Sequence, residues 1–138
     1  MLLSEEMAGS IARAAAAYGL TVPRLQLMFV LGLEGETRQV DLATYLDCSP
    51  RQITALVDGL VTSGHVVRSM QPGDRRVRLV SLTDKSRRIV DEVVDARVAL
   101  AEWLFEGLDD DELQSFGALS EVLISRMGGP ALSRLSGM

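Results

Sequence analysis

The sequence is poor in the residues that build disulfides, metal centres and most active sites. It has one cysteine and one histidine in 138 residues, and aromatic side chains make up 4% of it. One cysteine cannot close a disulfide within the chain, and one histidine and one cysteine cannot form a metal site. The sequence contains no Ser/His/Asp set, no helical histidine pair and no glycine-rich phosphate loop. We therefore expect no enzyme activity, no metal and no cofactor.

Long apolar runs are also missing. No apolar stretch approaches the roughly 18 residues that would suggest a membrane span. The first residues, Met1 to Glu6, lack the basic region followed by an apolar one that marks a signal peptide. Together with the single cysteine, these features predict a cytoplasmic protein without a membrane partner. Apolar residues still form 47% of the chain, which is ordinary for a folded domain.

Positive charge is concentrated in the middle of a chain whose net charge is −5. Residues 1–37 have a charge balance of −2, residues 38–88 of +4, and residues 89–138 of −7. A local excess of lysine and arginine is where the phosphates of a nucleic acid would bind. The distribution therefore predicts that the middle segment meets DNA and that the acidic C-terminal segment faces away from it.

Two short helices with a tight connector are predicted between about Gln39 and Ser63. Ser49 can cap the second helix, because its hydroxyl can accept a bond from an orphan backbone N–H, and Pro50 suits the first helical position. Helical spacing predicts one buried face made of Ile53, Leu56, Val57 and Leu60. The polar side chains near the start of this helix then face outward, as they do in a helix-turn-helix that reads the DNA major groove.

The segments before and after these two helices predict further helices and a β-hairpin. Val66–Val67 and residues 77–82 read as two strands joined by the turn residues Gln71 to Asp74, which predicts a β-hairpin. An apolar segment from Leu25 to Leu31, with Thr21 as its expected cap, predicts a buried helix. Amphipathic helices are predicted at both ends of the chain, over about residues 2–17, 83–106 and 109–127. The last of these begins with a capping box of Asp109 and Glu112, and the tail, 131–138, is expected to be poorly ordered.

Together these motifs resemble the MarR family of bacterial winged helix-turn-helix regulators. The resemblance rests on the segment Leu56 to Asp58, on Gly64, on the Asp-Arg-Arg of residues 74–76 and on the closing Leu82-Thr83. It implies a mainly α fold with a small β-hairpin, built as a winged helix-turn-helix with terminal dimerisation helices. It also implies a homodimer that binds a palindromic operator in double-stranded DNA and regulates, most often represses, transcription.

The resemblance further implies a division of labour along the chain. Residues 1–20 form an N-terminal dimerisation helix, 21–82 the DNA-binding domain, and 83–138 the C-terminal dimerisation helices and tail. The recognition helix, about 49–63, enters the major groove, and the wing, about 70–78, enters the minor groove. The predicted DNA-binding residues are Ser49, Arg51, Gln52, Thr54, Arg68, Arg75, Arg76 and Arg78. One of the two adjacent wing arginines is assigned to the minor groove, and the other to an ion pair with Asp58 or Asp74.

Several alternatives accompany this interpretation. Members of the family often release DNA when they bind a small molecule, and Tyr18, Phe29 and Trp103 are the candidate ligand-binding residues here; the alternative is that they are core and interface residues. Cys48 has two interpretations. It is the redox-sensing thiol of a protein that still binds DNA, or it is a structural cysteine. His65 is expected to pack rather than to sense protons. A different class of function would be a winged-helix module that binds another protein.

Overall fold

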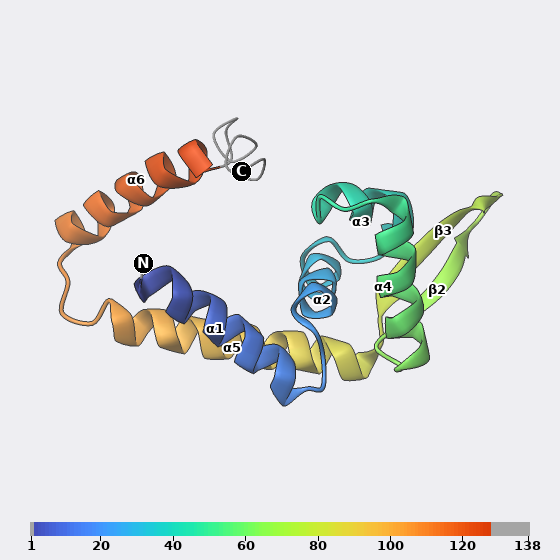
Figure 1. Cartoon of the computed structure of the whole chain (residues 1–138), viewed down its shortest axis with the longest axis horizontal. Helices are drawn as coiled ribbons and strands as arrows, with labels where there is room; N and C mark the ends of the chain where they lie inside the picture. Colours follow the sequence, from blue (N-terminus) through green and yellow to red (C-terminus); the bar gives the residue numbers. More distant parts are fainter. Residues whose placement is uncertain (1, 128–138) are drawn as a thin grey trace. The chain divides into compact units, whose positions relative to one another are not determined.

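The structure is a computed structural model that describes residues 2–127. The chain divides into two compact units, residues 1–96 and 97–138. The elements labelled in Figure 1 are α1 (Leu2–Ala17), α2 (Val22–Glu34), β1 (Thr37–Arg38), α3 (Gln39–Tyr45), α4 (Pro50–Thr62), β2 (Val66–Gln71), β3 (Asp74–Leu82), α5 (Asp84–Leu104) and α6 (Asp110–Met127). This set confirms the expected fold class, mainly α with a small β-hairpin in a winged helix-turn-helix.

The predicted helices agree with these bounds to within a residue or two, whereas the strands are longer than predicted. The tail at 131–138, expected to be poorly ordered, lies outside the described residues. Within residues 2–127, no single helix has the length and apolar character to cross a membrane; only α1 and α2 taken as a pair, bent by 86°, meet the criteria of length and composition.

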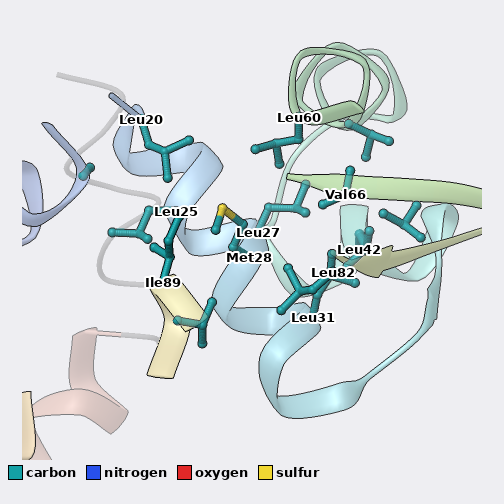
Figure 2. Close-up of a cluster of buried hydrophobic side chains, with 14 of the residues drawn as sticks. Leu20, Leu25, Leu27, Met28, Leu31, Leu42, Leu60, Val66, Leu82 and Ile89 are labelled. Carbon is teal, nitrogen blue, oxygen red and sulfur yellow. The ribbon is translucent and has the colours of Figure 1, made fainter. Parts of the chain in front are cut away.

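Helix α2 forms the centre of the first unit. Leu25, Leu27 and Met28 are completely buried and Leu31 is almost so. Figure 2 shows these side chains between Leu60 of α4 on one side and the start of α5 on the other. Each buried side chain of this size is worth roughly 1.5–3 kcal/mol relative to an exposed one. The apolar character of α2 thus fixes the helix-turn-helix and α5 around a common core.

The N-cap predicted for α2 is correct in its position but not in its hydrogen bond. Thr21 does occupy the N-cap position, but its side chain makes no capping hydrogen bond. A capping hydroxyl accepts from the second or third backbone N–H of the helix. Pro23 stands at the second position and has no N–H to offer, so one of the two possible donors is missing.

The sheet has three antiparallel strands in the order β1-β3-β2. Strand β1 pairs Thr37 with Val80 and was not predicted, because two residues are too short to show a period. The β2–β3 hairpin closes at Pro72-Gly73, and Gly73 has a left-handed φ of 87° that a side chain would disfavour. In Figure 1 this hairpin extends beyond α4.

The hairpin is irregular near its tip. Met70 pairs with Arg78, but the next residue, Gln71, pairs with Asp74, so the register shifts between them. Three residues of β3, 75–77, are therefore accommodated in a bulge. Bulges of this kind bend a strand and redirect its side chains, and this one carries two of the predicted DNA-binding arginines.

Helix α6 in the second unit begins as the sequence predicts. The backbone N–H of Glu112 donates to Asp109 Oδ1 at 2.9 Å, and the N–H of Asp109 donates to Glu112 Oε2 at 3.0 Å. These two bonds confirm the predicted capping box. Phe105, which precedes the helix, packs on Phe116 with the ring centroids 5.2 Å apart.

His65 is a packing residue at the end of the α4–β2 turn. It is 5% exposed, its Nδ1 lies 2.7 Å from the Ser63 hydroxyl, and its Nε2 is buried without a hydrogen-bond partner. Burial lowers the pKa of the imidazole, and the positive charges of Lys85 and Arg24 lower it further. The ring is therefore neutral in the folded protein near pH 7, as the packing interpretation expects.

This lowered pKa makes stability depend on pH. Below about pH 6.5, the ordinary histidine pKa, the unfolded chain binds a proton that folded His65 resists. Above that pH, His65 does not reduce the free energy of unfolding. Below it, the reduction grows as the pH falls toward the lowered pKa of His65 in the folded protein. We expect the free energy of unfolding to fall less between pH 7.5 and 5 in a His65→Phe variant than in the wild type, as measured by urea titration. Equal losses in both proteins would contradict this assignment.

Candidate nucleic-acid interface

The start of α4 is held by a complete capping box. The Ser49 hydroxyl accepts from the Gln52 N–H at 3.2 Å, and Gln52 Oε1 accepts from the Ser49 N–H at 2.9 Å. The predicted cap by Ser49 is confirmed, and the reciprocal bond from Gln52 is an addition to it. Because Oε1 of Gln52 is engaged in this bond, only Nε2 of its side chain is free for another partner. A paired hydrogen bond with adenine needs both Nε2 and Oε1, so such a contact would require the box to open.

The two polar neighbours of Gln52 differ in how firmly they are held. The Thr54 hydroxyl donates to the Pro50 carbonyl at 2.8 Å and accepts from Gln39 Nε2 at 3.1 Å. It therefore ties α3 to α4, and Gln39 is a positioning residue that the sequence did not indicate. Arg51 is exposed, and within the described part of the chain it makes no hydrogen bond or ion pair. Of the predicted residues on α4, Arg51 is the one free to reach outward.

The face of α4 opposite the core combines small, positive and negative side chains. Arg51, Ala55, Asp58 and Thr62 recur at helical spacing and are all exposed. Asp58 would repel a phosphate, but its Oδ1 accepts from Arg68 Nη2 at 2.6 Å. The pair neutralises the single carboxylate of this helix.

The Asp58–Arg68 pair corrects one expectation. Asp58 was a candidate partner for a wing arginine, yet its partner comes from β2, the strand that leaves α4 through the Gly64 turn. That short connection brings Arg68 to α4, whereas the wing arginines lie beyond it along the hairpin. Asp74, the other candidate, accepts from the backbone N–H of Arg76 at 2.9 Å and thereby holds the turn rather than a guanidinium.

Three arginines of β3 present uncompensated positive charge. Arg75, Arg76 and Arg78 are exposed, and none of them forms an ion pair with any residue in the range 2–127. Arg75 and Arg76 lie in the bulge, and Arg78 lies at its edge. Positive side chains on a projecting hairpin are what the negative potential of a DNA minor groove attracts.

A hollow of about 300 Å³ separates the start of α4 from β3. Arg76 and Arg78 stand on its rim together with Arg38, whose guanidinium is paired with Asp41 at 2.7 Å. The remaining lining residues are Gln39, Val40, Ala43, Pro50, Ile53, Thr54 and Val77. The recognition helix therefore has a positively charged border on the side of the hairpin.

The candidate ligand-binding residues belong to both units. The Tyr18 hydroxyl donates to Glu92 Oε2 at 2.7 Å, and this bond raises the pKa of Tyr18. Phe29 packs partly buried against the core, and Trp103 belongs to the second unit, where it is exposed. The hollow beside β3 and a second one, beside α2, are lined by other residues. A ligand site at these three residues stays a prediction.

Cys48 is partly exposed and packs against the edge of the core just before α4. The sequence holds no second cysteine with which it could pair inside the chain. Across residues 2–127, no three His, Cys, Asp or Glu side chains gather closely enough to hold a metal ion.

Comparison with known proteins finds a family that part of this chain resembles. A family model described as the MarR family matches residues 18–77. An uncharacterised HTH-type transcriptional regulator of Bacillus subtilis (strain 168), YhbI, is 28% identical over 97 residues, which cover 70% of this chain and 63% of the relative. The HTH-type transcriptional repressor IacR of Pseudomonas putida is 24% identical over 108 residues, which cover 78% of this chain and 65% of the relative. The matches thus span slightly less than two thirds of either relative.

A solved structure has the same fold. A mutant of MepR from S. aureus, bound to an oligodeoxyribonucleotide, superposes with a TM-score of 0.69 at 17% identity, and the alignment covers 91% of this chain and 93% of that one. At this identity the likeness shows the fold alone.

The capping box yields a test of how α4 is held. Replacing Ser49 by Ala removes the acceptor for the Gln52 N–H, and we expect the free energy of unfolding to fall by about 1 kcal/mol, within a range of roughly 0.5–2. Ser49→Asp restores an acceptor and should stay close to the wild type. Chemical denaturation of the three proteins measures the difference. Equal stability of the Ala and Asp variants would show that the cap contributes nothing.

Proposed function

We propose that this chain is a member of the MarR family of winged helix-turn-helix transcriptional regulators, to which residues 18–77 and the two regulators named above are similar, and that it binds DNA and regulates transcription. The proposed target is a palindromic operator in double-stranded DNA, bound by a homodimer in the cytoplasm. Repression is the proposed direction of control, in keeping with the name of the Pseudomonas putida relative. The proposal assigns the chain no enzyme activity.

The observation that carries this proposal is the border of free arginines beside the recognition helix. Arg75, Arg76 and Arg78 project from β3 without an internal partner among the described residues, next to the exposed face of α4. A helix in the major groove with a hairpin over the neighbouring minor groove would use both surfaces together. The MepR structure of the same fold, which is bound to an oligodeoxyribonucleotide, supports this reading.

The predicted residues then take different roles. Arg51 is proposed to read a base edge or to hold a phosphate, because it is exposed and unpaired within the described chain. Gln52 is proposed to donate from Nε2 while its capping bond persists, and Thr54 and Ser49 to position the helix while they contact the DNA backbone. Arg78 is proposed as a phosphate contact. Arg68 is proposed to act through Asp58, by removing its charge from the DNA-facing surface.

Release of DNA by a small molecule remains part of the proposal, at Tyr18, Phe29 and Trp103. The two rival functions lack a comparable observation. A protein-binding winged helix would not need free arginines along the bulge, and a redox sensor would need a partner for its thiol, whereas the sequence holds no second cysteine.

The apolar surface of α6 supports assembly as a homodimer. Leu119, Leu123 and Ile124 are 66%, 60% and 68% exposed, so one chain alone leaves this face in water. On α1, Ile11 and Ala14 are half-buried, whereas the side chains of Leu3 and Met7, predicted to complete that stripe, lie outside the described part. We propose that a second copy of the chain covers α6.

The wing arginines test DNA binding. The Arg75→Ala and Arg76→Ala double variant should bind every duplex more weakly, and the slope of log K against log salt should fall by about 0.9 for each phosphate that the wing no longer binds. Fluorescence anisotropy of a labelled duplex across a salt series measures both quantities. A control that removes two other arginines, Arg13→Ala with Arg126→Ala, should keep the wild-type slope. An unchanged slope in the folded wing variant would overturn this role of the wing.

The α6 face tests the dimer. The wild-type chain should sediment as a dimer at micromolar concentration, and Leu119→Glu with Leu123→Glu should raise the dissociation constant by at least about a hundredfold, because burying a leucine contributes roughly 1.5–3 kcal/mol. Leu33→Glu changes a leucine of α2 that is 86% exposed and should leave the dimer intact. Sedimentation of the wild type as a monomer would exclude the proposed assembly.

A further inference from the structure

The recognition helix contains a glycine that its conformation does not need. Gly59 lies inside α4, where glycine weakens a helix, and it has no left-handed φ. Space explains it. A Cβ atom at this position would stand 2.9 Å from Cζ and 3.2 Å from Nε of Arg24, and closer still to Nη2. The guanidinium of Arg24, which comes from α2, therefore lies directly against the backbone of α4.

Arg24 is a half-buried cation without an internal counter-charge. Within the described residues it forms no ion pair or hydrogen bond. It lines a hollow of about 540 Å³ that it shares with Gln52 and Ala55 of α4. A partly desolvated positive charge without a partner is costly, and an anion supplied from outside would offset that cost.

The position of this cation matches an edge of the DNA-facing surface. Gly59 follows Asp58 and lies four residues after Ala55, so Arg24 covers the flank of α4 beside its exposed face. The opposite flank borders the hollow that carries Arg76 and Arg78. Helix α4 itself has one arginine and one aspartate, and the aspartate is paired. Both flanks thus obtain positive charge from other elements.

We propose that Arg24 binds a backbone phosphate of the DNA whose major groove receives α4, reaching that phosphate across Gly59. This inference rests on the proposed DNA-binding function and adds a contact from α2 to it. Phosphates line both sides of a major groove, so a helix inserted there meets one row at each flank. Glycine at position 59 provides the space in which an arginine of another helix takes up this place.

The test compares the salt dependence of DNA binding in variants of the full-length chain. Arg24→Gln keeps part of the side-chain stem and removes the charge. We expect its slope of log K against log salt to fall by about 0.9 for each Arg24 that holds a phosphate. The loss of affinity should be the same on a duplex recovered by selection and on a mixed-sequence duplex. Arg24→Lys keeps a point charge and should keep most of the slope.

A matched control is present in α1. Arg13 lies over Gly9 in a similar way, with Nη1 3.1 Å from where a Cβ atom would stand, but it is paired with Glu6 at 3.7 Å. Arg13→Gln should leave the slope unchanged. Thermal melting of each variant confirms that it is folded. Arg24→Met, which keeps an apolar stem without the charge, takes the place of Arg24→Gln should that variant fail to fold, and the same loss of slope is expected.

A rescue experiment tests the location. Arg24→Gln removes Nη2 and Cζ, the two atoms that stand nearest to a Cβ at position 59, so Gly59→Arg combined with Arg24→Gln should restore the slope. A slope that stays low in this folded double variant would show that the flank at Gly59 does not meet the DNA backbone.

The outcomes separate this inference from the function on which it rests. If the wild type binds no duplex at any salt concentration, the proposed function fails. If the wild type binds and only the wing variant shows a reduced slope, the Arg24 contact alone is wrong. Titration with inorganic phosphate in the absence of DNA tests whether Arg24 binds a free anion instead of a DNA phosphate. Saturable binding that is abolished in Arg24→Gln, together with an unchanged DNA slope, would assign the site to a free anion and overturn the proposal.

Discussion

The burial of α2 is the interaction on which the first unit depends. Its fully buried leucines and Met28 contact α4 and the strands on one side and the start of α5 on the other. If α2 lost this packing, the recognition helix and the hairpin would lose the common surface that sets their relative position. The same helix also carries Arg24, so the element that forms the core also places a charge beside α4. Core packing and the proposed binding surface are therefore not independent in this protein.

The positive charge of the proposed binding surface comes from the elements around α4 more than from α4 itself. Helix α4 carries one arginine, Arg51, and one aspartate, Asp58, so its own net charge is zero, and Arg68 of β2 pairs with Asp58. Besides Arg51, the unpaired cations around α4 in the described residues stand on β3 and α2. This arrangement reconciles a net charge of −5 with the proposed DNA-binding function, because arginines of several elements gather around one helix while residues 89–138 have a charge balance of −7. Long-range attraction to DNA then depends on a local patch.

Local sequence signals predicted most of the fold. The cap at Ser49 follows from a serine placed before Pro50, and the cap at Asp109 follows from Glu112 three residues later. The buried α2 follows from a segment that is apolar nearly all round, so these features were predictable from the sequence. Strand β1 was missed because two residues have no period. The hairpin strands were predicted too short because their outer halves are exposed on both faces and show no alternation of apolar and polar residues.

The tertiary contacts of the candidate site were less accessible to sequence reasoning. The pairing of Arg68 with Asp58 joins a strand to a helix, and the approach of Arg24 to Gly59 joins residues that are distant in the chain. Spacing along one element cannot reveal either. A glycine inside a helix was the one available signal for Arg24, and it marks a close approach without naming the partner.

Selection of bound sequences from a random pool of duplexes by the purified protein tests the central claim most directly, namely that two copies of α4 read the major groove from the arginine-bordered surface. We expect enrichment of one two-fold symmetric sequence whose half-sites are centred about 10–10.5 base pairs apart, or a multiple of that spacing. A pool that shows no enrichment, or that is enriched in a single asymmetric half-site, would contradict it.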